Sequence, residues 1–122
     1  LALDRAEIAA SELGHVNANA IGLPSDQKEA NVISNVLGNV PVFSASGHFG
    51  NLGSGAGAVE LVASLLAVEK GILPATKNCE EVDPACPINV VKNSPIPLQK
   101  TSFLKLNHGN TGRSFALVLE KY

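Results

Sequence analysis

The glycine-rich stretch at residues 53–58 is the first feature of this chain whose spacing is typical of a chemical site. It reads Gly-Ser-Gly-Ala-Gly-Ala and matches G-x-G-x-x-A, in which amides between a strand and a helix bind a dinucleotide pyrophosphate. The expected strand before it ends near Ser44, about eight residues too early for that turn. The Gly-Lys-Ser/Thr of a P-loop is absent. Tight helix packing through small residues is the simpler interpretation, with dinucleotide binding as the alternative.

The two cysteines, Cys79 and Cys86, are the next candidates for chemistry. Glu80, Glu81 and Asp83 lie between them, and negative neighbours disfavour the thiolate, which is the reactive form of cysteine. A small secreted domain held by disulfides usually carries four or more cysteines. We therefore interpret both as ordinary loop cysteines and expect a reducing, cytoplasmic location.

Length and charge exclude several classes of partner. The chain has 122 residues, 45% hydrophobic and 16% charged, a composition that suits a folded core. A formal net charge of −2 gives no electrostatic reason to expect nucleic acid or an anionic membrane. The longest apolar stretch, residues 59–68, is about half the length of a membrane span. Because the chain opens on Leu1 rather than Met, we expect a piece of a longer protein.

The apolar periodicity and the helix-ending glycines predict alternating helices and strands. The expected helices cover residues 1–13, 25–37 (capped by Ser25 or Asp26) and 59–70. The expected strands cover residues 15–21, 40–44, 88–91, 103–106 and 114–120, with the proline-rich residues 72–100 as an extended connection. The helix at 59–70 carries apolar residues on more than one side, which predicts burial. This order of elements predicts an α/β layered domain.

Four segments, in order along the chain, carry a resemblance to a known family. Residues 16–24 read Val-Asn-Ala-Asn-Ala-Ile-Gly-Leu-Pro and are followed by Asp26 and Glu29. Residues 50–60 read Gly-Asn-Leu-Gly-Ser-Gly-Ala-Gly-Ala-Val-Glu. The Pro-Ala-Thr-Lys-Asn and Asp-Pro-Ala-Cys motifs follow within residues 71–86, and residues 104–122 close the chain. These segments resemble, with the same order and spacing, the corresponding motifs of the β-ketoacyl-acyl-carrier-protein synthases.

The resemblance implies a thiolase-like layered α/β fold. Residues 1–122 would form one C-terminal βαβαββ half, a single domain with a central mixed sheet flanked by helices. The half that precedes it would supply the cysteine that takes the acyl group. The implied partners are acyl-carrier protein and acyl and malonyl thioesters, in a homodimer or heterodimer, with no nucleic acid and no membrane. The resemblance implies no cofactor and no metal.

The chain departs from the family where catalysis would take place. Asn19 and Asn51 stand in place of the two histidines that assist decarboxylation and stabilise the oxyanion, and Ser46 stands in place of a lysine. An amide can donate a hydrogen bond to a thioester oxygen but cannot exchange a proton near pH 7. We interpret His48 and His108 as ordinary loop histidines, with the alternative hypothesis that one of them supplies the missing imidazole.

The closing segment departs from the family as well. His108 and Asn110 replace two phenylalanines, the second of which gates acyl entry in this family, whereas Gly109 and Gly112 are retained. By position, the resemblance assigns Gly109, Asn110 and Gly112 to substrate binding.

The sequence leaves two functions open. The first is a synthase-like enzyme of fatty-acid or polyketide synthesis, which condenses an acyl thioester with a malonyl thioester and uses Asn19 and Asn51 as oxyanion donors. The second is a non-catalytic, chain-length-factor-like subunit that pairs with an active synthase. We take the synthase-like protein as the prediction and leave its catalytic activity open.

Overall fold

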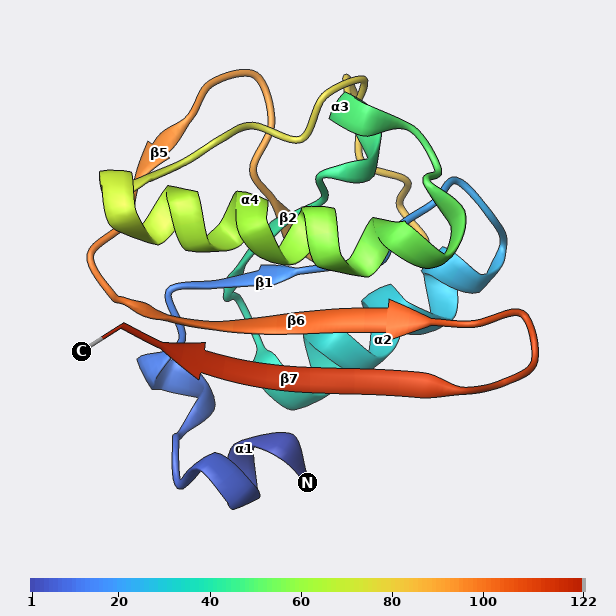
Figure 1. Ribbon diagram of the computed structural model, residues 1–122. Helices are drawn as coiled ribbons and strands as arrows, with labels where there is room; N and C mark the ends of the chain where they lie inside the picture. Colours follow the sequence, from blue (N-terminus) through green and yellow to red (C-terminus); the bar gives the residue numbers. More distant parts are fainter. Residues whose placement is uncertain (122) are drawn as a thin grey trace.

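A five-stranded mixed sheet with the strand order β4-β2-β1-β6-β7 forms the centre of the molecule (Figure 1). The structure is a computed structural model and describes residues 1–121. The first four strands run parallel, and β7 runs antiparallel to β6. The strands are β1 (His15–Asn17), β2 (Pro41–Phe43), β4 (Asn89–Val90), β6 (Ser102–His108) and β7 (Ser114–Glu120). The predicted α/β class with a central mixed sheet is confirmed.

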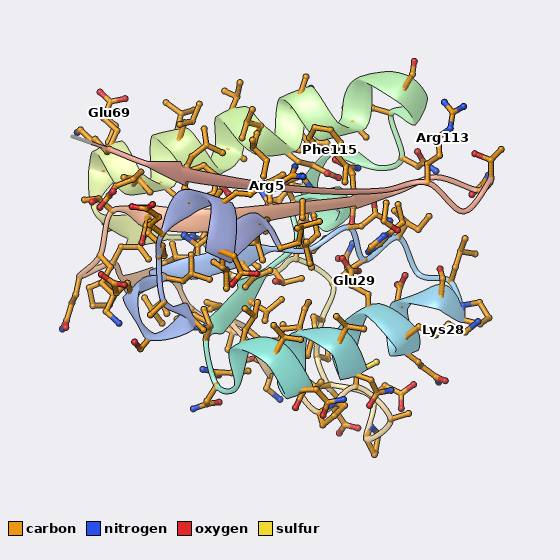
Figure 2. The ribbon with its side chains drawn as sticks, turned by 90° about the horizontal axis from the view of Figure 1, so that it is seen from below. Arg5, Lys28, Glu29, Glu69, Arg113 and Phe115 are labelled. Atoms are coloured by element: carbon orange, nitrogen blue, oxygen red, sulfur yellow. The ribbon has the colours of Figure 1, made fainter. Side chains whose placement is uncertain are left out.

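Two long helices cover opposite faces of this sheet. Seen from below, α2 (Ser25–Leu37) and α4 (Ala56–Lys70) lie on either side of the strands (Figure 2). The short elements are α1 (Ala2–Ala6), η1 (Ala10–Glu12), α3 (Ser46–Phe49), η2 (Gly53–Gly55) and the antiparallel pair β3 (Ile72–Leu73) and β5 (Ile96–Pro97). Within residues 1–121, no helix is both long enough and apolar enough to cross a membrane.

The two faces of β1 differ in polarity because side chains alternate along a strand. Val16 points toward α2 and joins a core cluster with Ile33 and Leu104. His15 and Asn17 point the other way and bind Ser64 of α4. The sheet therefore presents an apolar face to α2 and a partly polar face to α4.

The N-terminal helix is shorter than predicted. It ends at Ala6 because Glu7 adopts the left-handed conformation (φ 55°), and a separate 3-10 turn follows at Ala10–Glu12. The strand predicted over residues 15–21 ends at Asn17. The Ala18 N–H still donates to the Phe43 carbonyl of β2, but the N–H groups of Asn19 and Ala20 donate to the Glu29 carboxylate instead of a neighbouring strand.

The helix α2 has its predicted bounds but not its predicted cap. Pro24 occupies the N-cap position without a side-chain hydrogen bond. The Asp26 carboxylate instead accepts the N–H groups of Gly22 and Leu23, before the helix. At the other end, Gly38 ends the helix with φ 66°, a conformation that glycine adopts without strain.

The prediction that residues 59–70 form a helix is confirmed, but within this chain the helix is half exposed rather than buried. Val62, Leu65 and Leu66 are each 44–52% exposed. The buried positions include the polar Glu60 and Ser64, because the sheet face beneath α4 is itself partly polar. The apolar residues around the helix predicted burial on every side. Its orientation is instead decided by Glu60 and Ser64, which face the sheet and bind polar side chains there.

Candidate functional site

A pocket of about 700 Å³ opens at one edge of the sheet. The strands β1 and β6 are parallel neighbours, so their carboxyl ends meet at this edge, where the start of α4 also lies (Figure 1). Fourteen residues line it: Asn19, Ile21, Asn51, Gly53, Ser54, Ala56, Gly57, Asn107, His108, Gly109, Asn110, Arg113, Ser114 and Phe115. The lining combines asparagine side chains with one imidazole and one guanidinium, and it contains no carboxylate.

Asn19 is held at the pocket by its backbone. Its N–H donates to Oε1 of Glu29 at 2.8 Å, and the N–H of Ala20 donates to Oε2 at 3.1 Å. Glu29 is buried and reaches this loop from α2 (Figure 2). One carboxylate therefore fixes the turn after β1 while the Asn19 side chain faces the pocket.

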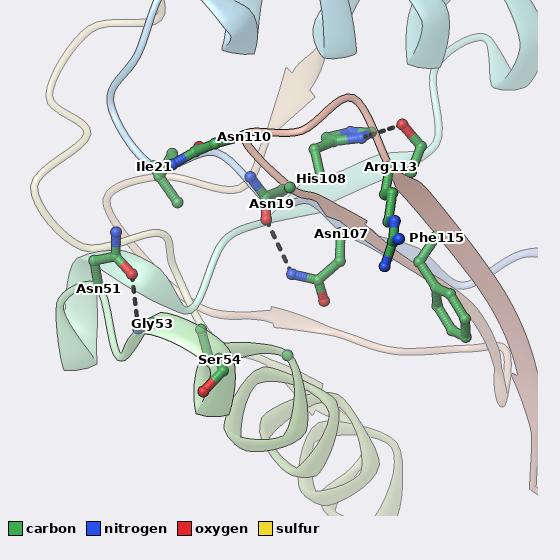
Figure 3. A pocket seen from close by; sticks show the side chains of 14 residues that line it. Asn19, Ile21, Asn51, Gly53, Ser54, Asn107, His108, Asn110, Arg113 and Phe115 are labelled. Atoms are coloured by element: carbon green, nitrogen blue, oxygen red, sulfur yellow. Dashed lines mark hydrogen bonds between the residues drawn. The ribbon is translucent and has the colours of Figure 1, made fainter.

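Asn51 reaches the same pocket from the loop between α3 and η2. Its Oδ1 accepts the N–H of Gly53 at 2.9 Å (Figure 3). This local hydrogen bond occupies the amide oxygen, so the Nδ2 group is the end available for a ligand. Asn19 and Asn51, 32 positions apart in the sequence, thus line one pocket.

The chain has three histidines, all within the described residues, and His108 is the one that lines the pocket. Its Nδ1 lies 3.0 Å from Oγ of Ser114 and its Nε2 lies 3.2 Å from Oε1 of Glu29. The contact between Nε2 and Glu29 is short enough for an ion pair, but its geometry is not that of a hydrogen bond. The imidazole is therefore placed between a hydroxyl and a carboxylate, with about a third of its side chain exposed.

Ser46 and His48 lie outside this lining. The Ser46 hydroxyl donates to the carbonyl of Ala20 at 2.6 Å and lies 2.8 Å from that of Ser44. The His48 Nε2 lies 2.9 Å from the carbonyl oxygen of Ala75. Both side chains thus bind backbone near the site, and the structure does not bring them to the pocket.

The turn after β6 carries the three residues that the resemblance assigns to substrate binding, and that role stays a prediction. Gly109 and Asn110 line the pocket, whereas Gly112 lines an adjacent cavity of about 570 Å³. The turn is closed by a hydrogen bond from Gly112 N–H to the Gly109 carbonyl at 3.1 Å. Gly112 has φ 79°, which favours glycine.

Asn107 was not among the predicted site residues, because the strand was expected to end at residue 106, whereas β6 continues to His108. Continuing the strand alternation from Lys105 would have placed Asn107 on the face toward α4. Arg113 was also missed, since nothing in its local sequence distinguishes it from an ordinary turn residue.

A buried ion pair lies on the same face of the sheet. The Nζ of Lys105 is 2.7 Å from Oε2 of Glu60, and both side chains are 4% exposed. Burial lowers the pKa of Lys105, while Glu60 opposes the shift by hydrogen bonding and by its charge. The ammonium also donates to the carbonyl of Leu106. This pair joins β6 to α4 directly beneath the pocket wall.

His15 lies further along this polar layer and is expected to make stability depend on pH. It is fully buried, stacks on Phe103 with 5.0 Å between ring centroids, and contacts Ser64. Burial lowers the pKa of His15 from 6.5 to about 4. Its contribution to folding is therefore complete above pH 6.5 and is lost as the pH falls from 6.5 toward 4.

The expected loss is about 3 kcal/mol of unfolding free energy between pH 7 and pH 4 from this residue. Urea unfolding at a series of pH values measures it. His15→Gln, which retains a group able to bind Ser64, should flatten the dependence, while His48→Gln should leave it unchanged. An unchanged slope in His15→Gln would contradict the assignment.

Within residues 1–121, no three His, Cys, Asp or Glu side chains are grouped so that they could hold a metal ion. The G-x-G-x-x-A residues form η2 and the first turn of α4, well after the end of β2 at Phe43. They are not a strand-to-helix turn, so the dinucleotide interpretation lacks its required geometry.

Comparisons with known proteins agree on one family. Residues 1–80 match the family model described as "Beta-ketoacyl synthase, C-terminal domain". The tetracenomycin polyketide synthase ketoacyl synthase alpha subunit of Streptomyces glaucescens is 33% identical over 98% of this chain and 29% of its own length. The beta subunit from the same organism is 30% identical over 100% of this chain and 31% of its own length.

A solved structure gives the same result. The structure described as "The ishigamide ketosynthase/chain length factor" superposes with a TM-score of 0.92 at 28% identity, covering 98% of this chain and 30% of that one. The chain therefore spans about three-tenths of the length of the relatives it matches.

Proposed function

Because this chain belongs to the β-ketoacyl synthase family, we propose that it is the C-terminal domain of a synthase-like protein of fatty-acid or polyketide synthesis. Its reaction is the decarboxylative condensation of an acyl thioester with a malonyl thioester, both presented by acyl-carrier protein. The observation that carries this proposal is that Asn19, Asn51 and His108 line one pocket.

In the proposed reaction, these side chains act on the malonyl thioester. The bond between its carboxylate and its α-carbon breaks, CO₂ leaves, and the electron pair passes to the enolate. Negative charge then develops on the thioester oxygen, where the Nδ2 groups of Asn19 and Asn51 are suited to donate. The α-carbon attacks the acyl carbonyl, and the thiolate of a cysteine elsewhere in the protein leaves.

His108 supplies the imidazole of this pocket, and imidazole is the side chain that most often serves in proton transfer. Its two nitrogens lie beside Ser114 and Glu29, which would fix the ring orientation. We assign it the role of the missing imidazole, which requires the ring to turn so that one nitrogen leaves Ser114 or Glu29 and donates toward the malonyl unit during decarboxylation. Gly109 and Asn110, in the adjoining turn, would contact the pantetheine or acyl part of the substrate.

A chain-length-factor-like subunit is the second candidate. It is favoured by the amides at Asn19 and Asn51, which cannot exchange protons. Identity does not separate the two functions, because an alpha subunit and a beta subunit match almost equally, at 33% and 30%.

Intact-mass spectrometry tests these two functions against each other. The intact protein that carries these 122 residues is incubated with an acyl thioester of acyl-carrier protein. A mass gain of one acyl group, abolished by prior alkylation of thiols, is expected for the synthase. A folded protein that gains no acyl group would contradict catalysis and favour the partner subunit.

We place the protein in the cytoplasm as a homodimer or a heterodimer. Free Cys79 and Cys86 support a reducing compartment. Exposed Val62, Leu65 and Leu66 on α4 support burial of this helix against further protein.

A further inference from the structure

Asn107 contacts Asn19 inside the pocket, and this contact decides which end of the Asn19 amide is free. The Nδ2 of Asn107 donates to Oδ1 of Asn19 at 3.0 Å. The nitrogen of Asn19 lies at the other end of its amide, away from Asn107 (Figure 3). Glu29 holds the Asn19 backbone through a separate hydrogen bond. The contact with Asn107 therefore fixes the side-chain torsions of Asn19.

We propose that Asn107 is a positioning residue that holds Asn19 as a hydrogen-bond donor toward the carbonyl oxygen of a thioester substrate. This proposal rests on the proposed function, in which Asn19 is an oxyanion donor. The two ends of an amide are similar in size but opposite in hydrogen-bonding character. Only the NH₂ end stabilises developing negative charge, whereas the oxygen end would repel it.

The start of α4 leaves room for this arrangement at Gly57. A Cβ built on Gly57 would lie 2.5 Å from Oδ1 of Asn107 and 3.6 Å from its Nδ2. A glycine in a helix costs about 1 kcal/mol relative to alanine. Here the missing Cβ allows α4 to approach β6 while Asn107 keeps its contact with Asn19.

The Lys105–Glu60 pair holds the two elements that enclose Asn107. Lys105 precedes Asn107 by two positions on β6, so their side chains lie on the same face of the strand. Glu60 follows Gly57 by three positions on α4, about one helical turn. A buried contact of 2.7 Å between these side chains therefore sets the spacing in which the Asn107 amide sits.

The test uses Asn107→Asp in the intact protein, because aspartate has nearly the same shape but its carboxylate cannot donate. Asn19 must then turn its Nδ2 toward Asp and its oxygen toward the pocket. The probe is an acetyl-pantetheine thioester labelled with ¹³C at the carbonyl, bound to protein whose thiols have been alkylated so that the acetyl group is not transferred, and observed by difference infrared spectroscopy. In the unmodified protein we expect the bound carbonyl band at lower frequency than in water, and in Asn107→Asp we expect most of that shift to be lost.

The kinetic result should agree with the spectrum. The kcat of condensation is expected to fall about 10- to 100-fold in Asn107→Asp, with KM for the malonyl thioester within about threefold, because the lost interaction forms with the developing charge. Asn89→Asp on β4 is the matched control, since Asn89 binds the Asn39 carbonyl away from the pocket. It should retain both the band position and the rate.

Gly57→Ala reaches Asn107 from the helix side and keeps the proposal testable if Asn107→Asp does not fold. It should shift the carbonyl band toward its free value without lowering the urea midpoint. A full downshift in a folded Asn107→Asp or Gly57→Ala variant would overturn the positioning role while leaving the proposed function intact. An unshifted carbonyl in the unmodified protein would overturn Asn19 as a donor and this proposal with it, whereas the proposed function is judged separately by acyl mass gain.

Discussion

Replacing Lys105 by methionine is expected to lower the free energy of unfolding by about 3–5 kcal/mol, the usual cost of removing one partner of a buried ion pair. Glu60 would keep its carboxylate at 4% exposure without the ammonium that neutralises it. Methionine retains most of the volume and apolar stem of lysine, so little of the loss would come from a cavity. Urea unfolding at pH 7, monitored by circular dichroism, measures the change.

The double variant Lys105→Met/Glu60→Gln separates the ion pair from general packing. Because both charges are removed, it should recover much of the stability that Lys105→Met loses, with a coupling energy of about 1–3 kcal/mol. Lys77→Met is the matched control, because Lys77 is exposed and its replacement should change stability by no more than about 0.5 kcal/mol. Equal effects at Lys77 and Lys105 would contradict a structural role for the pair.

Replacing His108 by alanine is expected to reduce the condensation rate of the intact protein about 100-fold or more, the usual contribution of a positioned proton-transfer group. His108 lines the pocket with Asn19 and Asn51, and it is held between Glu29 and Ser114. Product formation from acetyl and malonyl thioesters, followed by mass spectrometry, gives the rate.

His48→Ala provides the comparison, because the His48 ring contacts the Ala75 carbonyl outside the pocket. It should change the rate by less than about threefold, as expected when no group touching the substrate is removed. His108→Gln distinguishes hydrogen-bond donation from proton exchange, since glutamine donates but does not titrate. A His108→Ala variant with the normal rate and an acylated cysteine would show that the two asparagines suffice.

Local patterns predicted the elements whose stability depends on near neighbours in the chain. The helix at Ser25–Leu37 and the strand at Ser114–Glu120 have their predicted bounds. Side-chain periodicity and the glycine that follows mark the helix, and a continuous apolar run marks the strand. The two-residue strands β3 and β5 were missed, since two residues carry no periodicity and each strand exists only through its partner. The predicted thiolase-like layered fold is confirmed by the family match and the structural neighbours.

Within the site, the sequence by itself determined which residue types are available: two asparagines in the inherited positions, and a histidine and two glycines in the closing turn. Only the tertiary structure decided which of them meet. It brought His108 rather than His48 to the pocket, joined Lys105 to Glu60, and turned Asn107 toward Asn19. The physical reason is that these contacts join residues 45–88 positions apart, and strand register and helix rotation, which no local pattern encodes, place their side chains on one face.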